Sequence, residues 1–514
     1  MLKIFRNIAK VSLATILSRL LGLVRDALML AALGAGLGSS AFILAFTLPN
    51  LFRRLLGEGA LTSAVVPVLS HSLQNGNRSS AYCILNHVFS RLVCALCLLV
   101  ILVCGGFYGF SHLEQLSERW QLCAELAVWT FPYVGFICLS ALVVAALNVL
   151  GRFGAGAASP VLLNLSLISA MTYGILRDLP DNQLLVCMVF GVLLGGAIQL
   201  LVPSLDLYRQ GWRPKFIFSE SESSRKVRTL FVPGLLGAGV VQLNLVLSRF
   251  LAHSLEDNAV SILFLASRLM ELPLGVGTLA ITTVFFPLLA NSTNKSDPDA
   301  FSAVFVKGLR MVLALSIASA AGLFLLREHL VRLLFEWGAF NSSDTVLTAP
   351  LVGIYAACIP LYSCGGFCLR ALHAQQEMRW PVRVAGVCLF VNLIGGWICM
   401  QFWGVVGLAF ASLLAACVQA ALMLHGVAKL KLLIRWQQLG RPLMHALVAA
   451  CLMGLICQGG LLLLDTFVMS GKASALLAVA CVVPLGVVCY LLVLRLFRDE
   501  VVMELLHLLP LQKK

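Results

Sequence analysis

The sequence predicts an all-α membrane protein that crosses the bilayer many times. Of its 514 residues, 60% are hydrophobic and only 12% are charged, whereas a soluble chain is about a quarter charged. Apolar runs of roughly 18 residues or more, enough for a helix to cross the bilayer, recur from end to end. No alternating strand pattern is visible. Because backbone polar groups in lipid must be satisfied within the protein, the spans are expected to be helices.

We expect about fourteen spans, each near the length that a bilayer requires. Their approximate ranges are 11–33, 40–69, 84–108, 126–149, 157–176, 183–206, 229–252, 260–290, 303–326, 347–372, 381–402, 405–428, 440–464 and 473–497. The second and eighth spans exceed a straight crossing. The second contains Pro49 and Pro67, and the eighth contains Pro273 and Pro287. Proline removes a helical hydrogen bond, so we predict kinked or broken helices there.

Charge in the loops predicts the orientation. Basic residues gather in the loops on one side, above all in the segment 209–228, and this asymmetry places both termini in the cytoplasm. The net charge of +14 could suggest a nucleic-acid partner, but the basic residues lie in short loops where they set topology, so none is expected. The 17 cysteines are scattered through apolar segments without the spacing of a metal site or a disulfide framework.

The chain also repeats itself. Residues 64–72, AVVPVLSHS, are echoed by 284–292, VFFPLLANS, and residues 148–164 are echoed in the same order by 375–392. The echoes predict an N-terminal lobe of six spans at 1–215 and a C-terminal lobe of six spans at 216–428. A unit with an even number of spans keeps its orientation when repeated, so the lobes are expected to be parallel repeats. Residues 429–514 would add two helices and a cytoplasmic tail.

Charged residues in the first two spans suggest the functional centre. They are Arg19, Arg25, Asp26, Arg53, Arg54 and Glu58. A charge in the middle of a span costs roughly 2.5–3.5 kcal/mol on insertion scales, and such residues usually face a wet cavity or a partner. We therefore predict a cationic cavity. The alternatives are snorkelling toward the interface and structural pairing, the latter above all for Arg54 and Glu58, which stand four residues apart.

These motifs resemble those of the MurJ/MviN family, bacterial lipid II flippases of the multidrug/oligosaccharidyl-lipid/polysaccharide exporter superfamily. Residues 18–26 read SRLLGLVRD and residues 48–60 read LPNLFRRLLGEGA. Further matches are FPY at 131–133, the segment 148–164, SRLMELP at 267–273 and GAF at 338–340. The resemblance covers the whole chain. It implies fourteen helices, with a C-terminal pair that borders a groove for a lipid tail, and alternating access around a central cationic cavity.

The resemblance also implies which residues act. It assigns substrate binding to Arg19, Arg25, Arg53 and Arg268, and supporting or gating roles in the cavity to Ser18, Gly22, Asp26, Arg54 and Glu58. Lipid II carries a pyrophosphate between a disaccharide-pentapeptide and a polyprenyl tail, and guanidinium binds phosphate bidentately without losing its proton. On one helix Arg19, Gly22 and Asp26 share a face. Expected partners are lipid II, membrane lipids and proteins of cell-wall synthesis and division, in the bacterial inner membrane.

Four positions depart from the family pattern. Ser40 and Ser267 stand where the family often has acidic residues, and Ser248 precedes Arg249 where members with a sodium site have an acidic residue. Gly396 occupies the matching position of the eleventh span. A sodium site is therefore not expected.

Competing functions remain at this point. A multidrug exporter, or an exporter of another polyprenyl-pyrophosphate oligosaccharide, would share the architecture, although organic cations favour carboxylates over arginines. An integral-membrane enzyme acting on polyprenyl-linked sugars would need acidic metal ligands or a catalytic carboxylate. A non-transporting scaffold would not need a charged interior. No catalytic grouping, phosphate loop or metal motif is recognisable, so neither an enzyme nor a cofactor is expected.

Overall fold

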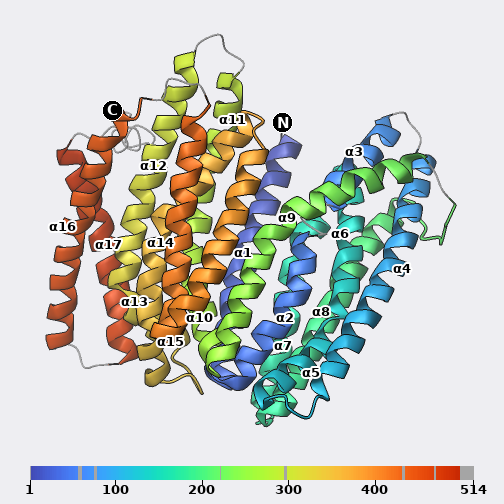
Figure 1. Cartoon of the computed structure of the whole chain (residues 1–514), viewed down its shortest axis with the longest axis horizontal. Coiled ribbons are helices and arrows are strands. Elements are labelled where there is room, and N and C mark those ends of the chain that lie inside the picture. The colour runs from blue at the N-terminus through green and yellow to red at the C-terminus, as the bar shows by residue number, and fades with distance from the viewer. Residues whose placement is uncertain are drawn as a thin grey trace. The chain divides into compact units, whose positions relative to one another are not determined.

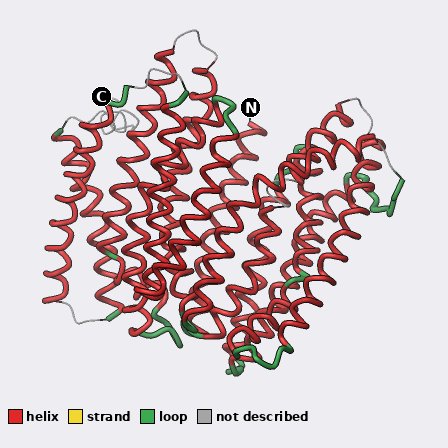
Figure 2. Tube along the Cα trace, viewed as in Figure 1, coloured by secondary structure: helices red, strands yellow, loops and turns green. Residues whose placement is uncertain are grey.

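The computed structural model describes residues 2–55, 61–74, 78–219, 222–293, 298–430, 435–467 and 471–497. Within these ranges the elements are helices joined by short loops, and no described residue belongs to a strand (Figure 2). The all-α prediction is confirmed. The chain divides into two compact units: Met1–Ser261 with Trp337–Phe340, and Ile262–Glu336 with Asn341–Lys514.

The helices are labelled in Figure 1. The first unit contains α1 (Leu2–Leu33), α2 (Leu37–Phe52), α3 (Leu61–Gln74), α4 (Arg78–Ser111), α5 (Glu118–Thr130), α6 (Tyr133–Val149), α7 (Gly154–Leu176), α8 (Asp181–Arg209) and α9 (Glu222–Leu255). Helix α10 (Ala259–Pro273) leads into the second unit, which continues with a π-helical turn (Leu274–Thr278), α11 (Leu279–Thr293), α12 (Pro298–Leu325), α13 (Arg327–Phe335), α14 (Ser342–Ala374), α15 (Arg379–Ala428), α16 (Gln437–Phe467) and α17 (Lys472–Leu496).

Among the described residues, eight helices are long and apolar enough to cross a membrane. Helices α5 and α6 make a ninth span if they are taken together, although they bend by 41° at their junction. The predicted span 126–149 therefore contains a break, which falls at Pro132, where the ring cannot donate a helical hydrogen bond. The count of fourteen spans and the division at 215 and 428 stay predictions.

Two further helices are interrupted where prolines occur. Helix α10 ends at Pro273 and passes through the π-helical turn Leu274–Thr278 into α11, which confirms the predicted break in the eighth span. Helix α2 carries Pro49 and likewise enters a π-helical turn at residues 53–55. The echoing segments 64–72 and 284–292 lie on α3 and α11. These are the helices that follow α2 and the π-helical turn Leu274–Thr278.

Helix α15 is a hairpin of two helices. Gly404, at φ +53° and ψ −132°, breaks the helical path between the predicted spans 381–402 and 405–428. The two arms pack closely, because a Cβ atom on Gly407 would stand 2.2 Å from the carbonyl oxygen of Cys399. Further along, the Trp380 indole donates to the Leu422 carbonyl at 2.9 Å. The break therefore falls between the two predicted ranges, and glycine allows the tight turn between them.

A buried glutamine fixes α7 in the first unit. The Gln199 amide on α8 donates to the Ser159 carbonyl on α7 at 2.7 Å and accepts from the Tyr133 hydroxyl on α6 at 3.0 Å. The Ser140 hydroxyl donates to the Gln199 carbonyl at 2.7 Å. Gln199 is 2% exposed, and these bonds satisfy both ends of its side-chain amide. These bonds hold α6, α7 and α8 in one register, and α1 packs on α7.

The second unit has an aromatic core. The Phe367 ring on α14 packs against two others. Its centroid lies 6.1 Å from that of Phe285 on α11 and 5.7 Å from that of Phe305 on α12. Helices α16 and α17 pack beside α12, where the Tyr490 hydroxyl donates to the Ala314 carbonyl at 2.7 Å. The C-terminal helix pair is thus part of this unit.

Residues 337–340 belong to the first unit, and a glycine permits their contact with α1. The Ala339 N–H donates to the Ala31 carbonyl at 2.8 Å. Gly338 has φ +57°, and a Cβ atom there would lie 2.2 Å from the Ala31 oxygen. Only glycine fits both the backbone conformation and this approach.

We predict that Gly338→Ala lowers the apparent melting temperature of the purified protein more than Gly151→Ala does. Gly151 also has positive φ, at +73°, but a Cβ atom there meets nothing within 4 Å. The control therefore carries only the conformational cost, about 1–2 kcal/mol, while Gly338→Ala adds the collision. Equal shifts in the melting temperature would contradict the docking described for residues 337–340.

Candidate functional site

Arg25 and Asp26 form an ion pair on α1 that a side chain from α7 completes. The Arg25 Nη2 atom lies 2.6 Å from Asp26 Oδ1, and Arg25 Nε donates to the same oxygen at 3.0 Å. Arg25 Nη1 donates to Asn164 Oδ1 at 3.1 Å. The Asn164 amide nitrogen donates to the Ser18 carbonyl at 3.0 Å. We call Ser18, Arg25, Asp26 and Asn164 the α1–α7 polar cluster.

The pattern of apolar residues on α1 explains why this cluster is interior. Gly22 and Asp26 stand one turn apart and are buried, Asp26 to 1% exposure. Leu13, Ile16 and Leu20 are exposed. Asp26 is thus an acid in the interior of an apolar unit, where an ionised carboxylate needs a paired and hydrogen-bonded partner. The Arg25 guanidinium is that partner, and the cluster is structural as well as a candidate site.

The Arg25 guanidinium also keeps part of its binding capacity. A guanidinium has five N–H donors. The bonds described above use one on each of its three nitrogens. Its side chain is 21% exposed. One N–H on each terminal nitrogen is thus left to donate to an oxyanion.

The other predicted residues of the first two spans differ in their surroundings. Arg19 is half-buried, one turn before Gly22 on the same helix. Arg53 Nε donates to Asn50 Oδ1 at 3.1 Å, in the π-helical turn that follows α2. Arg54 is exposed. Glu58 lies outside the described residues, so its predicted pairing with Arg54 remains a prediction.

Arg268 lies in the second unit, on α10. Its Nη1 atom donates to Glu271 Oε2 at 3.1 Å, one turn away, and its side chain is 26% exposed. The preceding Ser267 hydroxyl donates to the Phe264 carbonyl at 2.8 Å. Each unit therefore holds a partly buried arginine beside a carboxylate of its own helix. Whether Arg268 joins the arginines of the first unit at one anion remains a proposal.

Serines at the departures from the family pattern have hydroxyl and backbone partners. Ser40 Oγ lies 2.9 Å from Ser261 Oγ, and Ser39 Oγ lies 2.9 Å from the same atom. All three serines are fully buried. On α9 the Ser248 hydroxyl donates to the Asn244 carbonyl at 2.9 Å, and Arg249 Nη1 donates to the Thr47 hydroxyl. Serine hydroxyls with neutral partners thus stand at Ser40 and Ser248, where the family often has an acidic side chain.

Sequence reasoning missed two residues of these networks. Asn164 appeared only as the end of a motif, although a polar amide that recurs in a repeated apolar segment could have indicated a buried hydrogen-bonding role. Thr47 carried no signal, since threonine also bonds within its own helix, as Thr47 does to the Ile43 carbonyl at 2.6 Å. In the described part of the chain, no three His, Cys, Asp or Glu side chains are grouped as they would be around a metal ion.

The arrangement of helices is shared with solved structures of membrane transporters. The chain matches the inward-facing structure of a multidrug resistance MATE family transporter of the MOP superfamily with a TM-score of 0.66, at 13% identity, over 83% of this chain and 99% of that one. It matches a structure described as lipid II flippase MurJ, inward closed conformation, with a TM-score of 0.80, at 23% identity, over 95% of this chain and 99% of that one. These likenesses show the fold.

The sequence comparisons identify the family. The model of the family described as lipid II flippase MurJ matches residues 29–481. A probable lipid II flippase MurJ of Vibrio cholerae is 30% identical over 508 residues, with 95% of this chain and 94% of that protein covered. The Haemophilus influenzae protein of the same description is 31% identical over 439 residues, covering 81% of this chain and 84% of its own length. The chain belongs to the MurJ family of lipid II flippases, as its motifs predicted.

We predict that Asn164→Ala reduces transport without abolishing folding. It removes the α7 acceptor of Arg25, a bond to a charged group that contributes roughly 1.5–3 kcal/mol. Ser166→Ala is the matched control, because Ser166 is on the same helix but donates to the Gly191 carbonyl of α8 at 2.8 Å. Complementation of a flippase-depleted strain, with membrane abundance checked by blotting, should show a defect for Asn164→Ala alone. Equal growth of the two mutants at equal abundance would contradict a role for Asn164 in the site.

Proposed function

We propose that this protein translocates lipid II from the cytoplasmic to the outer leaflet of the bacterial inner membrane. The observation that carries the proposal is the family match over residues 29–481, joined by relatives described as lipid II flippases along nearly the whole chain. Arginine chemistry agrees with this substrate class. The pyrophosphate of lipid II is an anion, and the Arg25 guanidinium offers a planar fork to it.

In the proposed mechanism Arg19, Arg25 and Arg268 bind the pyrophosphate, with Arg53 as a further cation. Asp26 and Asn164 hold Arg25 in one orientation, so little side-chain freedom is lost on binding. Asp26 also lowers the net positive charge of an unloaded cavity, which keeps it stable without substrate. Alternating access then requires the two units to move around the bound headgroup. Membrane lipids surround the protein, and proteins of cell-wall synthesis and division are further candidate partners.

We also propose that the protein is not an enzyme and that both termini lie in the cytoplasm. Support for the orientation comes from the basic loops, among them residues 209–219. Labelling of a single cysteine from outside intact cells tests this orientation. Labelling of a Lys215→Cys variant would contradict it, and with it the direction of transport proposed here. The multidrug alternative is less consistent with a site of arginines, because exporters of organic cations need carboxylates that face the substrate.

We predict that Arg25→Ala, Arg19→Ala and Arg268→Ala each abolish complementation of a flippase-depleted strain while the protein stays in the membrane. One charge-assisted contact contributes roughly 1.5–3 kcal/mol, so its loss should weaken headgroup binding about tenfold or more. The Arg→Lys variants keep the charge but lose the fork, so they should retain part of the function.

If these arginines only snorkel toward the membrane interface, the opposite pattern is expected. The alanine variants would then support growth, and the lysine variants would be nearly equivalent to the wild type. Membrane abundance of each variant is the control, because a misfolded protein would also fail to complement. If all three alanine variants are abundant and support normal growth, the cationic cavity is wrong for this protein.

We predict transport that does not depend on a sodium gradient. Ser248 and Gly396 supply no carboxylate at the two positions where the family places sodium ligands, and oxygen ligands with negative charge favour hard cations. The test is the flipping rate in vesicles when sodium is replaced by potassium at fixed membrane potential and pH. A flipping rate that falls to the level of empty vesicles on this replacement would contradict the prediction.

A further inference from the structure

Residues 212–219, which follow α8 and precede α9, form a loop that contacts α4 and that we call the linker strap. The strap begins after Gly211, whose φ of +98° turns the chain away from α8. Four polar residues on one side of α4 contact it: Asn86, His87, Ser90 and Arg91. They form two pairs at a spacing of four residues, so their side chains line one face of the helix.

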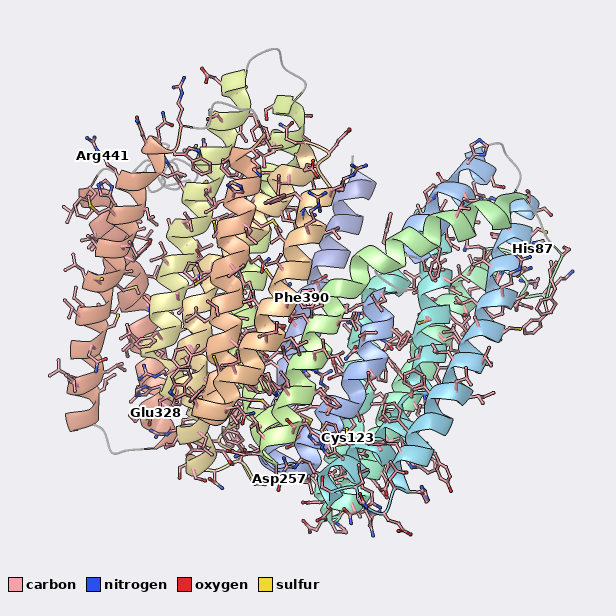
Figure 3. The ribbon with its side chains drawn as sticks, viewed as in Figure 1. His87, Cys123, Asp257, Glu328, Phe390 and Arg441 are labelled. Carbon is pink, nitrogen blue, oxygen red and sulfur yellow. The ribbon has the colours of Figure 1, made fainter. Side chains whose placement is uncertain are left out.

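The bonds run along the whole strap. Asn86 uses both ends of its amide, accepting from the Trp212 indole at 2.9 Å and donating to the Arg213 carbonyl at 3.0 Å. Ser90 Oγ accepts from the Ile217 N–H at 2.9 Å. At the far end, His87 Nε2 lies 2.9 Å from the Ser219 hydroxyl. His87 Nδ1 lies 2.8 Å from the Cys83 carbonyl, so it carries the proton and Nε2 accepts from Ser219. Figure 3 shows His87 on α4.

The α4 side of this attachment and Trp212 are buried, whereas residues 213–216, 218 and 219 of the strap are exposed. Ser90 is 0%, Trp212 2%, His87 4% and Asn86 5% exposed. The Phe89 ring on α4 packs edge-on against Trp212, with ring centroids 5.7 Å apart. If the strap left α4, it would expose Trp212 and leave the amide of Asn86 and the hydroxyl of Ser90 without these partners.

We propose that the linker strap stays attached to α4 throughout transport and moves as a fixed part of the first unit. This inference rests on the proposed transport function, because the sequence marks 209–228 as the link between its two repeated halves. A linker that lets domains move usually makes few contacts, and this one makes hydrogen bonds to α4 from Trp212 to Ser219. The helices on either side of the strap, α8 and α9, also belong to the first unit.

A disulfide between strap and helix tests the proposal. Ser90→Cys and Ile217→Cys join positions whose Oγ and N atoms are 2.9 Å apart, in a variant whose exposed cysteines have been replaced and whose lipid II transport in vesicles has been verified. The exposed cysteines are Cys83, Cys94, Cys97, Cys417, Cys451 and Cys481. The two single-cysteine proteins under the same oxidant are the controls. We expect the cross-linked protein to transport at no less than about half the rate of the reduced protein, since conformational steps often limit such rates.

The outcomes are distinct. A loss of about tenfold on cross-linking, reversed by a reductant, shows that the strap must leave α4 during a rate-limiting step and overturns the proposal. If neither a disulfide nor a short bifunctional maleimide joins the two cysteines, the proposal is also overturned, since the strap is then not held on α4. If the reduced protein moves no lipid II at all, the proposed function fails instead.

A second measurement uses the variant Asn86→Leu, which should loosen the strap. It should raise the reactivity of a lone Ile217→Cys toward a water-soluble maleimide, and unchanged reactivity would contradict the attachment.

Discussion

The pairing of a buried carboxylate with an arginine is the constraint on which the first unit depends. Asp26 is 1% exposed on an apolar helix, and its Oδ1 atom is 2.6 Å from Arg25 Nη2. Removing one member of such a pair leaves an uncompensated charge and costs about 3–5 kcal/mol. The pair therefore requires that α1 remain beside a helix that can supply a polar acceptor, and Asn164 on α7 supplies it.

This requirement extends from α7 into the rest of the unit. Helix α7 is held by the buried amide of Gln199 on α8, which also binds Tyr133 on α6. Helix α7 thus carries bonds at both ends of this path, to Gln199 in the core of the unit and to the Arg25 guanidinium. Such an arrangement suits an anion site, because the arginine is oriented before the substrate arrives. The same bonds keep the charges from destabilising the apolar interior when the site is empty.

Much of the fold could be predicted because membrane helices have a strong signal. The long apolar runs, the break after Pro273 and the turn between 402 and 405 follow from hydropathy, proline and glycine. The break at Pro132 was not predicted, since apolar residues continue through it. The attachment of residues 212–219 to α4 was missed as well: a basic, serine-containing segment resembles a surface linker, and its bonds come from α4, more than a hundred residues earlier in the sequence.

The candidate site was predictable in part for a different reason. Arginine in an apolar span is conspicuous, so Arg19, Arg25, Arg53 and Arg268 could be named from the sequence. Their partners could not, because Asn164 and Thr47 are ordinary residues whose importance depends on which helices become neighbours. Ser40 illustrates the same limit, since only the fold places Ser261 beside it.

The most direct test of the account is translocation of fluorescent lipid II by the purified protein in sealed vesicles, measured by the fraction that a membrane-impermeant quencher cannot reach. Wild-type protein should move lipid II between leaflets much faster than empty vesicles do, and Arg25→Ala reconstituted at the same density should not. An active wild type together with an equally active Arg25→Ala would contradict the anion site, and a wild type no faster than empty vesicles would contradict the proposed function itself.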